Sequence, residues 1–195
     1  MAEVETLIAP LLVPHRWTVD DFHQIIAAGV LDEDDRIELI NGVITEMSPI
    51  YAPHAACVDR LTALLFKIIG QHFCIRVQNP LYLAPKSQPQ PDVAIVQLQT
   101  DGYRLQHPTA TETLLVIEVS DSTLAVDRRV KAPLYAGAGI PEYWIVALNE
   151  HIVEQYSELT NNAYQTIVQY QRDQTLQSTS VSGLQLSVNA MLGQK

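Results

Sequence analysis

The amino-acid sequence predicts an α/β fold in which helices cover a central sheet. Residues 53–70 form a long stretch with helical periodicity. Residues 92–96 and 114–119 form two short, almost wholly apolar runs, as in strands that are covered on both faces. Three more strand-like segments follow a second helical segment, so helices and strands are mixed along the chain.

The first predicted element is a short helix that begins after Thr18. Thr18 and Asp21 have the spacing of a capping box, and Trp17 and Phe22 have that of a hydrophobic staple. Gly29 is a residue type that commonly ends a helix.

A β-hairpin is predicted next. The Asn41-Gly42 dipeptide favours a type I′ turn, which would join strands at residues 36–40 and 43–47. This register places Glu38 on the same face as Ile40. Glu38 is then either a rim glutamate in water or one acid on an otherwise apolar face, and the pattern leaves both readings open.

The remaining elements follow from periodicity and from turn residues. Pro53 suits the first turn of the helix at residues 53–70, and its predicted buried stripe is Val58, Leu61, Leu65 and Ile68. A third helix is predicted at residues 125–138, ended by Gly139. The predicted strands are residues 74–78, 81–84, 92–96, 114–119, 143–147, 152–156 and 164–170.

The chain is expected to form one domain, residues 1–195, with further strands at 150–190, because it has no repeat or linker. It has no apolar run near the ~18 residues that span a bilayer. Residues 1–13 lack the basic start of a signal peptide. Cys57 and Cys74 fit two free thiols in a reducing compartment, so we expect a cytoplasmic protein.

The net charge of −10 counts against diffuse attraction to nucleic acid, because phosphates bind where Lys and Arg displace their counterions. One local basic group, Arg128, Arg129 and Lys131, could still guide a backbone.

Two acids interrupt the two most apolar strands. Asp92 opens the first strand, and Glu118 lies near the end of the second. A buried carboxylate is unfavourable unless it is paired, hydrogen-bonded or bound to a metal. Two neighbouring carboxylates could share Mg²⁺ or Mn²⁺, which prefer oxygen ligands. Alternatively, Asp92 caps a turn and Glu118 pairs with an arginine.

The helix after Glu118 carries an acid, an ammonium and a phenol on one stripe, at Asp127, Lys131 and Tyr135. This pattern is either part of a site or an ordinary surface ion pair between Asp127 and Lys131. Pro133 predicts a bend in this helix or a later start.

Together, these residues resemble the motifs of a known family. The sequence is similar to the bacterial putative restriction endonuclease family that is expanded in cyanobacteria, formerly a domain of unknown function. The similarity runs in order over about residues 18–147. It is carried by the motifs Arg36-Ile-Glu-Leu-Ile-Asn-Gly, Met47-Ser-Pro, His54, Pro91-Asp-Val-Ala, Val116-Ile-Glu-Val, Asp127-x-x-x-Lys-x-x-x-Tyr and Gly139-Ile-Pro-Glu-Tyr-Trp.

The resemblance implies a PD-(D/E)XK nuclease core, a mixed sheet flanked by helices with a metal-dependent phosphodiesterase site. Asp92 and Glu118 match the two motif acids, and Glu38 matches an added N-terminal acid. Ser120 stands where the motif lysine is usual, and Lys131 matches the lysine that this family places on the next helix.

The resemblance also implies how the residues act. Asp92, Glu118 and the Val119 carbonyl would hold Mg²⁺ or Mn²⁺, with Glu38 as a further ligand, and Lys131 would orient the attacking water. His54 and Tyr135 match family positions, without an assigned role. Tyr143 and Trp144 are expected in the core or an interface.

The function that follows is metal-dependent cleavage of nucleic acid, with DNA the expected substrate, by a homodimer. The homodimer is expected because the late strands and the pair Tyr143-Trp144 add apolar surface. Two alternatives stay open: a nuclease fold that no longer cleaves and serves as a binding or assembly module, and a purely structural acid cluster.

Overall fold

The computed structural model describes residues 13–32 and 35–193. The segment considered above as a signal peptide lies, except for its last residue, outside the described residues. The elements, in order, are helix α2 (Val19–Ala27), strands β1 (Ile37–Ile40) and β2 (Val43–Glu46), helix α3 (Ala52–Ile69), strands β3 (Cys74–Val77) and β4 (Val93–Val96), a 3-10 turn (Ala110–Glu112), strand β5 (Thr113–Ser120), helix α4 (Leu124–Val126), a π-helical turn (Asp127–Lys131), helix α5 (Ala132–Ala138), strands β6 (Tyr143–Ala147), β7 (Ile152–Thr160), β8 (Ala163–Tyr170), β9 (Thr175–Gln177) and β10 (Gln185–Ser187), and helix α6 (Val188–Leu192).

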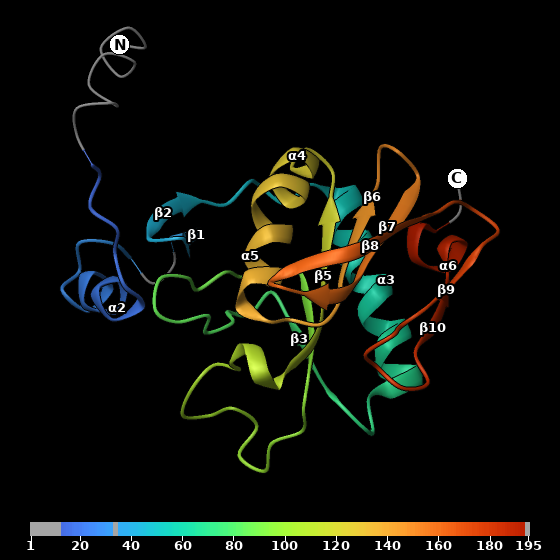
Figure 1. Ribbon diagram of the computed structural model, residues 1–195, viewed down its shortest axis with the longest axis horizontal. Coiled ribbons are helices and arrows are strands. Elements are labelled where there is room, and N and C mark those ends of the chain that lie inside the picture. The colour runs from blue at the N-terminus through green and yellow to red at the C-terminus, as the bar shows by residue number, and fades with distance from the viewer. Residues whose placement is uncertain (1–12, 33–34, 194–195) are drawn as a thin grey trace, which may run out of the picture.

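The central sheet has six strands in the order β3-β4-β5-β6-β7-β8. Only the β5–β6 pair is parallel, because a helical crossover connects these two strands. The other neighbours are antiparallel. This mixed sheet between helices confirms the predicted fold class (Figure 1).

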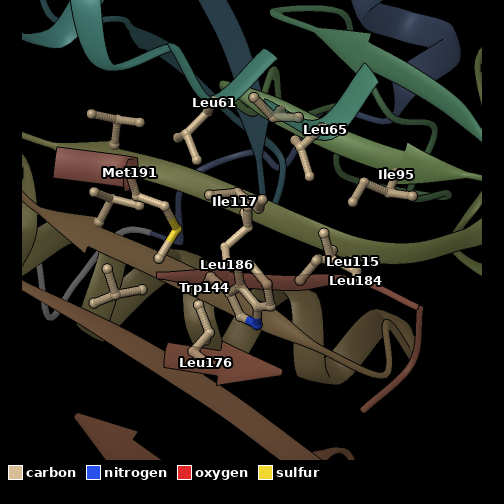
Figure 2. Packing of buried hydrophobic residues seen from close by; sticks show 14 of the residues in the cluster. Leu61, Leu65, Ile95, Leu115, Ile117, Trp144, Leu176, Leu184, Leu186 and Met191 are labelled. Carbon is tan, nitrogen blue, oxygen red and sulfur yellow. The ribbon is translucent and has the colours of Figure 1, made fainter. Parts of the chain in front are cut away.

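Alternate residues of the strands build two cores. On one face, Ile95, Ile117 and Trp144 pack with α3, α6 and the β9–β10 segment. Figure 2 shows this cluster, with Leu61 and Leu65 of α3 close to Ile117. On the other face, Ala94, Val116 and Ile145 pack with α5. The period-2 alternation of the strands therefore decides which side chains face α5.

The buried stripe of α3 differs from the prediction at its end. Val58, Leu61 and Leu65 are buried as expected, but Ile68 is exposed and Ile69 is buried in its place. A helix has 3.6 residues per turn, so eleven residues complete three turns more closely than ten do.

The N-terminal elements agree with the prediction. Thr18 and Asp21 form the capping box of α2. In the β1–β2 hairpin Ile40 pairs with Val43 around the predicted turn. Gly42 has a φ of +77°, and a Cβ atom there would lie 2.8 Å from Cβ of Arg16, so this turn requires glycine.

Residues 81–84 were predicted as a strand, and this prediction is wrong. The segment makes only isolated bridges, and the Leu83 amide donates to the carbonyl of Ser87 in a loop that folds back on itself. Pro80 and Pro85 flank the segment, and proline cannot donate to a ladder of strand hydrogen bonds. Leu81 and Leu83 are nevertheless buried, which explains their apolar character.

The strand prediction for residues 150–190 is confirmed for β7 to β10, and it missed the short helix α6. Arg60 of α3 fixes this helix by donating to the carbonyl oxygens of Met191 and Leu192, both at 3.0 Å. Among the described residues, no helix is both long and apolar enough to cross a membrane.

Candidate active site

Asp92 and Glu118 meet at one end of the β4–β5 pair. Val93 pairs with Ile117, so Asp92, one residue earlier, comes opposite Glu118. The Asp92 amide donates to Oε2 of Glu118 at 3.2 Å, and the Val119 amide donates to Oδ2 of Asp92 at 2.8 Å. The two strands thus hold each carboxylate against the backbone of the other.

Glu118 lies on the sheet face that α5 covers. Its Oε1 accepts hydrogen bonds from Nζ of Lys131 and from the hydroxyl of Tyr135, both at 2.9 Å. Burial raises the pKa of Glu118 to about 8; Lys131 opposes the shift, and the charges of Asp92, Asp127 and Glu38 add to it. The positive charge of Lys131 therefore does not fully compensate the burial of the Glu118 carboxylate and the negative charges around it.

Lys131 is buried and points at the two acids from the helix side. Its Nζ lies 2.9 Å from Glu118 and 3.5 Å from Oε1 of Glu38. Burial alone would lower the pKa of Lys131, but the neighbouring carboxylates raise it. Lys131 is thus held as an ammonium ion among acids.

A π-helical turn places the Lys131 side chain beside Glu118 and Glu38. It joins α4 to α5, and the Ala132 amide donates to the carbonyl of Asp127 across the widened turn. Pro133 then stands in the first turn of α5, where proline is tolerated. The predicted helix at 125–138 is thus interrupted where Pro133 indicated, and Lys131 and Tyr135 both reach Glu118.

Glu38 is buried, which excludes the reading of a rim glutamate in water. Its Oε2 accepts from the Gln90 amide at 3.1 Å, and its Oε1 is the atom that faces Lys131. The β1–β2 hairpin therefore adds a third acid to the same region.

His54, at the start of α3, contacts Asp92. Its Nε2 lies 3.0 Å from Oδ2 of Asp92, and this hydrogen bond raises the pKa of His54, although burial opposes the shift. His54 and the Val119 amide thus both contact Oδ2 of Asp92. The other oxygen, Oδ1, accepts from Gln78 at 3.3 Å.

Asp127 does not form the surface ion pair that its spacing from Lys131 allowed. It is buried and accepts from the hydroxyls of Ser120 at 2.6 Å and Thr123 at 2.7 Å. Ser120, which stands at the usual lysine position, therefore serves to fix Asp127. The charge of Asp127 still acts on Lys131 and Glu118.

The acids line one cavity of about 330 Å³. Among the described residues, no group of three or more His, Cys, Asp and Glu side chains is arranged to hold a metal ion. The predicted ligand set has two carboxylates, Asp92 and Glu118, and the Val119 carbonyl, to which Glu38 was added as a further ligand. Magnesium commonly takes one or two carboxylates and completes its shell with water and substrate oxygens, so this set fits it.

Three contacts of the site were missed by reasoning from residue patterns. His54 was noted only as matching a family position, Tyr135 was placed on the stripe of Lys131 but given no role, and Gln78 was not considered. The contact of Tyr135 with Glu118 follows from its helical spacing to Lys131 once Lys131 is placed at the acids. Tyr143 and Trp144 are fully buried in the two cores.

Comparisons with known proteins give a family match and a similar fold. Residues 19–189 match a family model described as Uma2, putative restriction endonuclease. The chain is also similar to a crystal structure of a putative nuclease belonging to DUF820 from Anabaena variabilis ATCC 29413. The identity is 16%, the TM-score is 0.71, and the match covers 90% of this chain and 97% of the other. No curated protein matches.

Proposed function

The chain belongs to the Uma2 family of putative restriction endonucleases, and we propose that it hydrolyses phosphodiester bonds of nucleic acid with a divalent cation. One observation carries the proposal. Lys131, an ammonium delivered from a helix, lies 2.9 Å from the buried Glu118, whose strand neighbour Asp92 shares the same cavity. A buried acid with a shifted pKa, such as Glu118, beside a cation in a cavity is typical of catalytic sites.

The donor set supports Mg²⁺ or Mn²⁺ as the ion. Asp92 Oδ1 has one long hydrogen bond from an amide, whereas Oδ2 is engaged by two donors. Oδ1 is therefore the oxygen that we assign to a cation, together with Glu118 and the Val119 carbonyl. When bound, such an ion acidifies water and offsets charge on the phosphoryl oxygens.

The residues of the chain would divide the remaining work. In the hydrolysis a water oxygen forms a bond to phosphorus and one P–O ester bond breaks. The water loses a proton to solvent or to a nearby base, and the leaving oxygen takes up a proton from solvent to become a hydroxyl. Lys131 would orient this water or stabilise the charge that develops. Glu38 and Tyr135 would hold Lys131 and Glu118 in place, and His54 would fix the Asp92 carboxylate.

Cleavage of nucleic acid tests the proposal. Wild type should cut a mixture of plasmid and single-stranded DNA in Mg²⁺ or Mn²⁺ and stop in EDTA, and Asp92→Ala should abolish the cut. Asp59→Ala, an exposed acid on α3, is the matched control and should cut as wild type does. Absence of metal-dependent cleavage from RNA and DNA alike would refute an active nuclease.

The alternative is a nuclease fold that binds nucleic acid or a partner without cleavage. The net charge of −10 opposes capture of a polyanion, so it counts against cleavage and favours a partner that is not a nucleic acid. Binding of a labelled oligonucleotide that survives long incubation with Mn²⁺ would select it.

We also propose a homodimer that pairs along strand β8. Tyr143 and Trp144 are buried inside the chain, so they cannot supply the apolar dimer surface that the sequence suggested for them. Strand β8 lies at the edge of the sheet, has no charged residue, and exposes Ile167 and Val168. Sedimentation should give twice 21.7 kDa for wild type and a monomer for Ile167→Lys. A wild-type monomer at tens of micromolar would refute the dimer.

A further inference from the structure

The proposed site lies at the floor of a cavity. Asp92 is 9% exposed, Glu118 4% and Lys131 9%. A scissile phosphate that meets these groups must leave the solvent and enter the cavity. In a regular double helix the bases beside a phosphate are paired and stacked, so a duplex offers the cavity a phosphate but no free base; freeing a base requires a few kcal/mol.

The charge of the cavity wall does not suit a long run of backbone phosphates, paired or unpaired. Its lining holds two cationic residues, Arg36 and Lys131, and six acids. Lys131 already contacts two carboxylates. Proteins that follow a duplex backbone need several Lys and Arg contacts to phosphate, and this lining offers one exposed cation, Arg36.

The exposed lining of the cavity includes apolar residues, one of them aromatic, beside the polar Arg36, Glu46, Ser48 and Ser122. Ile50 and Tyr51 from the start of α3, and Val126 and Val130 from the helical crossover, line the cavity, and each is more than a third exposed. Tyr51 is 58% exposed. Exposed tyrosine rings are the surfaces on which unpaired bases stack.

The volume agrees with a small occupant. The cavity of about 330 Å³ is at the lower end of the ~300–1,000 Å³ range of pockets that take one small molecule. We propose that the site accepts a single unpaired nucleotide of a nucleic acid strand, with its base against Tyr51 and its phosphate at Asp92 and Glu118. The inference rests on the proposed function, and it selects single-stranded or frayed nucleic acid over intact duplex.

The test compares two substrates and two variants. One substrate is a blunt hairpin, and the other is the same hairpin with a tail of unpaired thymidines, both in Mn²⁺. The variants are Tyr51→Ala and Phe66→Ala. Phe66 is a matched control, because it is an aromatic residue of α3 with 54% exposure that does not line the cavity.

We expect cleavage confined to the tail. Tyr51→Ala should raise KM for the tailed hairpin at least about fivefold, the lower end of the effect of one stacking ring, and Phe66→Ala should leave KM unchanged. Affinity should fall with salt with a log–log slope of about −1, which corresponds to one or two phosphate contacts.

Equal cutting of the blunt stem and the tail would overturn the inference and leave the nuclease standing. Equal KM values for the two variants would also overturn it. If neither substrate is cut, the proposed function fails. Binding of oligonucleotides in Ca²⁺ then tests whether the site prefers an unpaired strand. Preference for a labelled thymidine oligonucleotide over its duplex, lost in Tyr51→Ala, supports the inference, and equal affinity overturns it.

Discussion

Two buried glutamates of the central sheet, Glu142 and Glu118, have opposite surroundings. Glu142 precedes β6 near the start of β5 and accepts six hydrogen bonds, from Trp144, Gln155 and the turn at residues 178–180. Burial acts to raise its pKa, but these hydrogen bonds outweigh it and lower the pKa. Glu142 is therefore a satisfied anion.

Glu118, near the end of β5, accepts three hydrogen bonds and is surrounded by other acids. Its pKa is raised to about 8. Both glutamates interrupt apolar sequence, so burial alone does not mark a functional acid. The two glutamates differ in whether the protein supplies enough hydrogen-bond donors to stabilise the charged carboxylate. Glu118 lacks them, so a bound cation would stabilise its charged form.

The largest effect should come from Glu142. Glu142→Gln replaces one acceptor oxygen by an amino group that faces buried donors, so we expect a loss of about 4 kcal/mol in the free energy of unfolding. Urea unfolding measures it. A loss below about 1 kcal/mol would mean that the six hydrogen bonds do not stabilise the carboxylate.

Glu118 should make stability depend on pH in the opposite sense. Its pKa is about 8 in the folded protein, against an ordinary value of 4.5, so the unfolded chain releases this proton at lower pH. The metal-free protein should lose stability as pH rises from about 5 to 8, on the order of 3 kcal/mol from this group. Glu118→Gln should remove that part of the slope. An identical slope in both proteins would refute the raised pKa.

Lys131 tests whether the donors of Glu118 also serve catalysis. Lys131→Met should reduce metal-dependent cleavage at least ~10²-fold and leave Mn²⁺ affinity nearly unchanged, because we assign it to the water and not to the ion. Lys131→Arg should restore little, since a planar guanidinium does not copy a compact ammonium. Full activity in Lys131→Met would favour the non-cleaving alternative.

The smallest effect is expected at His54. His54→Asn should weaken Mn²⁺ binding about tenfold, as loss of a residue that orients a metal ligand commonly does. Calorimetry measures the affinity, and His72→Asn, outside the cavity, is the control. Unchanged affinity would reduce His54 to a packing role.

Much of this site could be predicted from local patterns. Asp92 and Glu118 stood out because acids are rare in covered strands, and Asn41-Gly42 placed the hairpin that carries Glu38. The position of Lys131 at the acids came from a family resemblance, because helical spacing alone equally allowed a pair with Asp127.

The rest depends on contacts that are distant in sequence. His54 and Asp92 are 38 residues apart in the sequence, and the turn at residues 178–180 is separated from Glu142 by a similar number of residues. Hydrophobic periodicity does not record such contacts. Pro133 indicated an interruption of this helix, but not that it takes the form of a π-helical turn, because the residues Asp127–Lys131 show no pattern specific to that geometry.

The central claim is that Asp92 and Glu118 hold a divalent cation, and isothermal titration of Mn²⁺ tests it without a choice of substrate. Wild type and Asp59→Ala should bind Mn²⁺ with measurable heat, and Asp92→Ala should show none. Binding should also raise the melting temperature of wild type, because the ion binds the folded state alone. Titrations of wild type and Asp92→Ala that are indistinguishable would contradict the account.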